Sequence, residues 1–167
     1  LEIARTLIHS PEILVLDEPT VSLASSDFDK IWQLLGYLQE QENLSILVTT
    51  DWAAEAAMCH RLVIFDRGHV VCIEDPSSLM GNVSAEVLSL KTCQPSFLKR
   101  CLEEVTGMSP RIIDGRVELE IENAHQWVER VVDSLPDGSF DSLLVRKANL
   151  SDVFLNLTGR GLNHREI

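Results

Sequence analysis

The chain has 167 residues, of which 45% are hydrophobic and 24% charged, and its formal net charge is −12. This composition is ordinary for one medium or two small globular domains. The acidic excess lies mainly in residues 1–83, which argues against a nucleic-acid surface, since such surfaces need clustered Lys and Arg. No apolar run approaches the length of a membrane span. The four cysteines show no CxxC spacing, which indicates reduced thiols in a cytosolic protein.

Strands and helices alternate through the first half of the sequence. After the end of a helix at 1–9, an apolar run predicts a strand at 13–17, buried on both faces of a sheet that helices cover. A stripe of apolar residues predicts an amphipathic helix over about 27–41. The elements expected after it are a strand at 45–50, a short Ala-rich helix at 52–59 and two strands at 61–66 and 69–74. This order predicts an α/β layer with a parallel sheet and an antiparallel hairpin at its edge.

The second half has a different order of elements. A short helix that starts at Pro76 is broken by Gly81-Asn82, and we place a domain boundary near residue 83, between domains 1–83 and 84–167. The expected elements are a strand at 85–91, a helix at 95–106, a hairpin of 111–114 and 116–122, a helix at 124–134 and a strand at 142–147. This β-α-β-β-α-β order is the ferredoxin-like arrangement. A last helix at about 150–158 ends at Gly159.

Two adjacent carboxylates, Asp17 and Glu18, end the strand at 13–17. Because carboxylates are costly to bury, we expect them at the exposed tip of the strand. There they can hold Mg²⁺ and orient a water molecule for attack on a phosphate. The alternative is a core strand that ends in an acidic turn and has no chemical role.

Four segments carry a resemblance to a known family: Leu1 to Arg5, Ile13 to Thr20, Val48 to Arg61 and Asn149 to Arg160. In that order they resemble the helix after the signature motif, the Walker B strand, the switch loop with its helix, and the tail of ATP-binding cassette (ABC) transporter ATP-binding subunits. The resemblance is to the multidrug and antibiotic exporter type. It implies an α/β fold, the C-terminal half of a P-loop NTPase sheet, followed by a small ferredoxin-like α+β domain.

The resemblance also implies roles and partners. Asp17 would bind Mg²⁺ through water, Glu18 would be the base that polarises the attacking water, and ATP would be the substrate, hydrolysed to drive export. The expected partners are a second, identical ATP-binding subunit and a transmembrane permease subunit. The expected location is peripheral, on the cytoplasmic side of the membrane.

Two positions depart from the family pattern. The family's switch loop ends in a His that contacts the γ-phosphate, and this chain has Asp51 there. At about 5 Å and an effective dielectric constant near 20, a carboxylate repels each unit of phosphate charge by roughly 3 kcal/mol. The alternative for Asp51 is that it caps a helix that starts at Trp52. Ala24 replaces an Asp that reaches the partner subunit's site, unless the change is neutral in this loop.

The family's phosphate loop and signature motif would lie before Leu1, so we expect this chain to be the C-terminal portion of a longer protein. Without a phosphate loop it has no backbone amides to cradle phosphates, and we expect no ATP binding by the chain alone. Three interpretations stay open: part of an exporter ATPase, a degenerate regulatory or assembly subunit, and a truncated remnant. Because the missing half would supply neighbouring strands and cover apolar surface, we also expect the isolated chain to expose a sheet edge or to self-associate.

Overall fold

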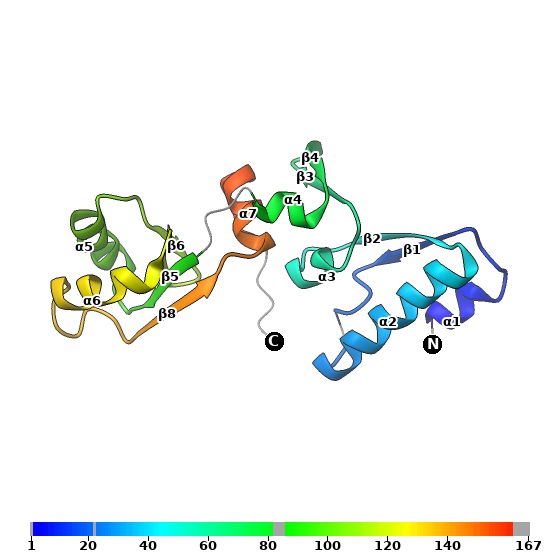
Figure 1. The fold of residues 1–167 in the computed structure, drawn as a ribbon, viewed down its shortest axis with the longest axis horizontal. Helices are drawn as coiled ribbons and strands as arrows, with labels where there is room; N and C mark the ends of the chain where they lie inside the picture. The colour runs from blue at the N-terminus through cyan, green and yellow to red at the C-terminus, as the bar shows by residue number, and fades with distance from the viewer. Residues whose placement is uncertain (1, 22, 82–85, 162–167) are drawn as a thin grey trace.

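The structure is a computed structural model that describes residues 2–21, 23–81 and 86–161. Its elements lie along one long axis, with the first strands and helices at one end and the second-half sheet at the other (Figure 1). The expected domain boundary near residue 83 lies outside the described residues. Among the described residues, no helix combines the length and apolar composition that spanning a bilayer requires.

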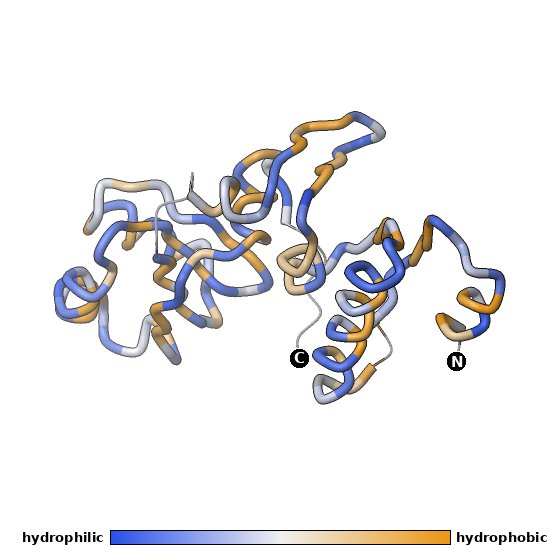
Figure 2. Tube along the Cα trace, turned by 45° about the vertical axis from the view of Figure 1, so that its right-hand side comes forward, coloured by the Kyte–Doolittle hydropathy of each residue, from blue (hydrophilic) through white to orange (hydrophobic). Residues whose placement is uncertain are grey.

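The first layer is a parallel pair of strands with helices on one face. The elements of this layer are α1 (Glu2–Leu7), β1 (Ile13–Asp17), α2 (Ser25–Glu42) and β2 (Ser45–Thr49). β1 and β2 pair in parallel, with Asp17 opposite Thr49. Leu14 and Leu16 of β1 are buried against Trp32 and Leu35 of α2. The apolar stripe along α2, orange against blue in Figure 2, is the face that makes this core.

The other face of the β1–β2 pair is open, so the expectation of a strand buried on both faces is wrong for the described chain. Ile13 and Val15 are each 63% exposed and Leu47 is 57% exposed. The physical reason is that the helices that pack on this pair, α1 and α2, both contribute to the core on the Leu14 side. This face therefore presents apolar side chains to solvent.

The predicted third strand does not join the parallel sheet. After the short helix α3 (Ala53–Ala57), β3 (Leu62–Asp66) pairs antiparallel with β4 (His69–Glu74), and this hairpin forms a sheet of its own in the described structure. Both arms of the hairpin are largely apolar (Figure 2). Apolar side chains on it, including Val63 and Phe65, stay exposed because only part of the hairpin packs on α3, α4 (Pro76–Gly81) and α7 (Leu150–Thr158).

The second half forms a four-stranded antiparallel sheet. Its elements are β5 (Glu86–Lys91), α5 (Pro95–Thr106), β6 (Arg111–Ile113), β7 (Arg116–Ile121), α6 (Ala124–Ser134) and β8 (Ser142–Lys147). The strand order in the sheet is β6-β7-β5-β8. Leucines and valines from one face pack on α5 and α6, with Leu88, Leu98 and Val131 fully buried. The predicted order of elements is thus present from β5 to β8.

The opposite face of this sheet is polar and lies against α7. Arg146 of β8 donates to both carboxylate oxygens of Asp152 on α7, at 2.7 and 2.8 Å, and to Glu118 of β7 at 2.8 Å. The hydrogen bond to Asp152, foremost, raises the pKa of Arg146 above its ordinary value. The guanidinium therefore stays charged at any working pH, and it ties α7 to two strands.

Candidate functional site

The two candidate acids lie at the carboxyl end of β1, as the sequence predicts for the tip of the strand. Asp17 is exposed and Glu18 is half-buried. The hydroxyl of Thr49, at the end of β2, donates to Oδ1 of Asp17. The Glu18 amide donates to the carbonyl of Thr49 at 2.8 Å. Parallel pairing therefore holds the acid pair against the end of the neighbouring strand.

Glu18 has an unusual backbone. Its φ is 45°, in the left-handed region that residues other than Gly enter at a cost of about 1–2 kcal/mol. The ladder of β1 with β2 ends at Asp17, and the chain turns at Glu18 rather than continuing the strand. Strained residues of this kind cluster at functional sites when the surrounding structure holds them in place. Here the bond from Glu18 to Thr49 is one such restraint.

A buried pair of side chains follows the acid pair. The backbone amide of Thr20 donates to Oε1 of Glu55 at 2.9 Å, and the Thr20 hydroxyl donates to the same oxygen. Thr20 is 3% exposed and Glu55, in the middle of α3, is 1% exposed. A buried carboxylate persists only when it is hydrogen-bonded or paired. This pair therefore fixes α3 to the segment that carries the acids.

Cys59 lies just beyond α3 and responds to the same carboxylate. Burial, first, and the negative charge of Glu55, second, raise the pKa of the Cys59 thiol above its ordinary value. Its Sγ donates to the backbone carbonyl of Glu55 at 3.7 Å. The thiol is thus held in its neutral form, as suits a side chain packed against the core of the first layer.

Asp51 does not cap a helix, so the capping alternative is wrong. Helix α3 begins at Ala53, its N-cap residue is Trp52, and no side chain makes the cap bond. The hydroxyl of Thr50 accepts from the Trp52 amide at 2.9 Å, and the helix starts one residue later than a cap at Asp51 requires. Oδ1 of Asp51 is buried and accepts no hydrogen bond within the described part of the chain.

The strand register places Asp51 at the same edge as the acid pair. Asp17 lies opposite Thr49, and Asp51 follows two residues beyond Thr49.

Ala24, the second departure from the family pattern, is exposed. It occupies the N-cap position of α2 without a side-chain cap bond. The neighbouring Ser22 lies outside the described residues.

The site offers some, but not all, of the groups that a magnesium nucleotide needs. Mg²⁺ prefers oxygen ligands and commonly takes one or two carboxylates together with phosphate oxygens and water. Asp17, which accepts a hydrogen bond from the Thr49 hydroxyl, can supply one carboxylate to the ion, directly or through a water molecule. No group of three or more His, Cys, Asp or Glu side chains able to hold a metal ion occurs within the described ranges. Binding of the ion would therefore depend on phosphate and water oxygens.

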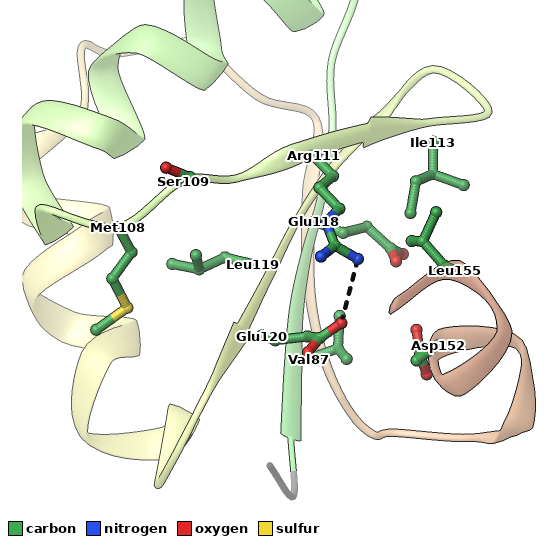
Figure 3. Close-up of a pocket in the computed structure, with 10 residues that line it drawn as sticks. All are labelled: Val87, Met108, Ser109, Arg111, Ile113, Glu118, Leu119, Glu120, Asp152 and Leu155. Carbon is green, nitrogen blue, oxygen red and sulfur yellow. Dashed lines mark ion pairs between the residues drawn. The ribbon is translucent and has the colours of Figure 1, made fainter. Parts of the chain in front are cut away.

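A cavity lies between the polar face of the second-half sheet and α7. This cavity of about 170 Å³ is lined by residues of β5, β6, β7 and α7 and of the segment before β6. Figure 3 shows Arg111 reaching across it toward Glu120, with Asp152 and Leu155 facing it from α7. The charged groups here are paired with one another: Arg111 donates to Asn156 at 2.6 Å, and Asn156 donates to Glu120 at 3.0 Å. The cavity is therefore part of how α7 packs on the sheet.

Sequence reasoning missed the contact between Thr20 and Glu55. The only signal for it was the position of Glu55 as the single charged residue in the helix Ala53–Ala57. An acid on a short helix is expected to face solvent, so this signal was weak. The packing of α7 on α3 was not expected either.

Proteins of one class match nearly the whole chain. Nod factor export ATP-binding protein I of Paraburkholderia xenovorans is 32% identical over 165 residues, which cover 96% of this chain and 51% of that protein. Its counterpart in Mesorhizobium japonicum is 30% identical over 165 residues, 96% of this chain and 46% of that protein. Linearmycin resistance ATP-binding protein LnrL of Bacillus subtilis is 29% identical over 174 residues, 97% of this chain and 54% of that protein. No model of a known protein family matches the chain.

All three relatives are named as ATP-binding proteins, two of them of Nod factor export and one of linearmycin resistance. Over nearly its whole length the chain is similar to ATP-binding subunits of ABC transporters, which confirms the resemblance seen in its sequence. It spans about half the length of the curated relatives it matches.

Proposed function

We propose that this chain forms the C-terminal part of the ATP-binding subunit of an ABC exporter and supplies the acid pair of its ATPase site. The observation that carries the proposal is the strained Glu18, which follows Asp17 at the end of β1 with φ 45° and bonds to the end of β2. In this proposal β1 is the Walker B strand. The names of the relatives, which all refer to ATP binding and in the Nod factor proteins also to export, support the same role.

Each acid has a distinct part in the proposed reaction. Bound Mg-ATP supplies the reacting phosphate and the charge that neutralises it. Asp17, whose carboxylate the Thr49 hydroxyl orients, would hold the metal through a water molecule. Glu18 would accept a proton from the attacking water, a contribution of about 10²–10⁴-fold in rate. The turn of the backbone at Glu18 separates the two acids, so that one can face the metal and the other the water.

The remaining parts of the proposal concern domains and partners. Residues 1–83 would be the partial ATPase domain and 84–167 an accessory domain of ferredoxin-like form, which the order β6-β7-β5-β8 supports. The phosphate loop and signature motif would come from the segment of the subunit before Leu1. A second copy of the subunit and a transmembrane permease would be the partners, at the cytoplasmic side of the membrane.

The alternative is a degenerate subunit whose ATP site is slow or inactive and which acts in regulation or assembly. The specific observation that favours it is Asp51, a carboxylate in the position of the family's phosphate-binding His, with one oxygen buried and without a hydrogen bond among the described residues. An ionised Asp only accepts hydrogen bonds, so it cannot donate to a phosphate as His does. Ala24 favours the same alternative.

ATP hydrolysis by the complete subunit tests both interpretations. Glu18→Gln keeps the shape of the side chain but removes the base, and we expect the rate to fall by about 10²-fold or more. Glu40→Gln, at an exposed position on α2, is the matched control and should leave the rate unchanged. A rate that Glu18→Gln does not alter would exclude Glu18 as the base. A complete subunit without any ATPase activity would favour the degenerate alternative.

Asp51→His separates the two hypotheses further. Restoring a donor and removing a negative charge should raise the rate of ATP hydrolysis, because roughly 3 kcal/mol of repulsion per unit of phosphate charge is relieved at about 5 Å. Asp51→Asn is the control for charge alone. If neither variant raises the rate, Asp51 does not face the phosphate.

A further inference from the structure

Helix α7 lies where the two halves of the chain meet (Figure 1). Two of its side chains, Leu150 and Val153, are buried in one apolar cluster with Leu79 of α4. The residues packed against this cluster come from α3, β3, β4 and α4: Ala53, Ala56, Leu62, Ile64, Cys72 and Met80. An element of the second half thus completes a core of the first half.

The opposite side of α7 is held by charged groups. Asp152 accepts two hydrogen bonds from Arg146, and it also accepts from the Asn149 amide at 2.7 Å, which completes a capping box at the start of the helix. Asn156, one turn further along, bonds to Arg111 and Glu120 on the sheet. Because contacts of both kinds act on one helix, its position and rotation are fixed relative to the sheet.

Helix α3, in contrast, has little to hold it in place by itself. It has five residues, and its N-cap residue makes no side-chain cap bond. So short a helix is not stable in isolation, and its stability must come from tertiary contacts. Among the described residues these contacts include the bond between Glu55 and Thr20 on one side and the packing of Ala53 and Ala56 on the α7 cluster on the other. At the two ends of the helix, Trp52 contacts the ring of Phe28 on α2 and Cys59 packs on the core of the first layer.

We propose that α7 is a brace for α3, and that Arg146 and Asp152 are thereby positioning residues for the segment that carries Asp17 and Glu18. The chain of contacts runs from Arg146 to Asp152, through the α7 cluster to α3, and through Glu55 to Thr20. Loss of the brace loosens α3 and frees the Thr20 segment. The catalytic part of this inference rests on the proposed function; the mechanical part does not.

Hydrogen exchange of backbone amides tests the mechanical part on the 167-residue chain. The substitution is Val153→Ala on α7, and the control is Val131→Ala on α6, an equally buried valine in the other core. The reporter amides are those of Ala56, which bonds to the Trp52 carbonyl at 3.1 Å, and of Thr20. We expect Val153→Ala to speed their exchange about tenfold relative to the control, as a local loss of stability does.

Equal exchange at Ala56 and Thr20 in the two variants overturns the brace, because the effect would then be global. If Val153→Ala does not fold, Leu150→Val takes its place, with Leu119→Val as the control in the second-half core. A rise in exchange confined to α7 and the second-half sheet also overturns it.

Steady-state kinetics of the complete subunit test the catalytic part. Arg146→Met removes the charge, whereas Arg146→Lys keeps the charge but loses the two-point hydrogen bond. We expect Arg146→Met to lower kcat for ATP about tenfold with KM unchanged, and Arg146→Lys to restore part of kcat, since positioning acts on the reaction step. An unchanged kcat in Arg146→Met overturns the assignment of Arg146 and Asp152 as positioning residues. If the wild-type subunit hydrolyses no ATP, the proposed ATPase activity fails, and exchange at Ala56 and Thr20 still decides the brace.

Discussion

Thr20, in the loop after β1, donates two hydrogen bonds to one buried carboxylate oxygen of Glu55 on α3. The pair joins the segment after the acid pair to α3, which begins two residues after Asp51. Hydrogen bonds to a charged group contribute about 1.5–3 kcal/mol to stability. The contact is therefore strong enough to hold α3 and the acid pair in a fixed relation.

Thr20→Val removes the hydroxyl but keeps the shape of the side chain. We expect it to lower the free energy of unfolding by about 2 kcal/mol, because the buried carboxylate loses one of its donors. Urea unfolding followed by circular dichroism gives the value. The control is Thr6→Val, since the Thr6 hydroxyl donates to Ile3 at an exposed position and its loss should cost less than about 0.5 kcal/mol. Equal losses at both sites would contradict the structural role of the pair.

Ala24→Asn should stabilise the chain. Ala24 has the extended backbone of an N-cap residue, with φ −67° and ψ 150°, but has no side-chain acceptor for the first amides of α2. Asn supplies that acceptor without adding a charge next to Asp27, and we expect a gain of about 1 kcal/mol in the free energy of unfolding. Ala24→Val, which offers no acceptor, is the control. Thermal unfolding that shows no difference between the two variants would exclude an N-cap effect.

Arg146→Met should destabilise the second half. The substitution leaves the carboxylates of Asp152 and Glu118, whose side chains are 5% and 12% exposed, without their shared cation. Breaking a buried ion pair from one side typically costs about 3–5 kcal/mol, and the partial exposure of Arg146 places our expectation near 3 kcal/mol. Chemical denaturation of the variant measures the loss. Arg100→Met, at an exposed position on α5, is the control, and a similar loss there would argue against the network.

Alkylation of Cys59 should require a pH above the range that is usual for a thiol. The thiolate is the reactive form, and a raised pKa means that less of it is present at a given pH. The rate at Cys59 should therefore reach its midpoint at a pH above the ordinary value for a thiol. Iodoacetamide labelling at several pH values, read by peptide mass spectrometry, gives the pH profile of Cys59.

Glu55→Gln tests whether the charge of Glu55 contributes to the raised pKa of Cys59. It removes the negative charge that contributes to the raised pKa of Cys59, so the midpoint of the Cys59 profile should move to a lower pH. A Cys59 midpoint that stays in place would leave burial as the sole cause of the shift.

In the second half, the order of helices and strands could be predicted from turn residues and apolar alternation. The dipeptide Asp114-Gly115 requires positive φ at both residues for a tight hairpin turn, and the structure has φ values of 47° and 75° there. Gly159, with φ 74°, ends α7 as expected. The elements from β5 to β8 follow the predicted order, because turn residues and apolar alternation act over short distances in the sequence.

Long-range contacts were beyond reach of the sequence patterns. The run from Ile13 to Leu16 is apolar at every position, so it does not reveal which face of β1 is covered. The acid pair was predictable because it ends an apolar strand. Glu55 was not, because its partner Thr20 is 35 residues away. The apolar side of α7 is visible in the sequence at Leu150 and Val153, but nothing local identifies α3 as its partner.

The open face of β1 and β2 has a consequence for the charges at its end. Two unit charges 4 Å apart interact by about 1 kcal/mol in bulk water and by about 4 kcal/mol at an effective dielectric constant near 20. Asp17 is exposed at the end of this uncovered face, so water screens its field. If an apolar surface packed over Ile13, Val15 and Leu47, it would exclude water and lower the effective dielectric constant near Asp17. The electrostatic attraction between the acid pair and a cation would then rise several-fold without a contact to either carboxylate.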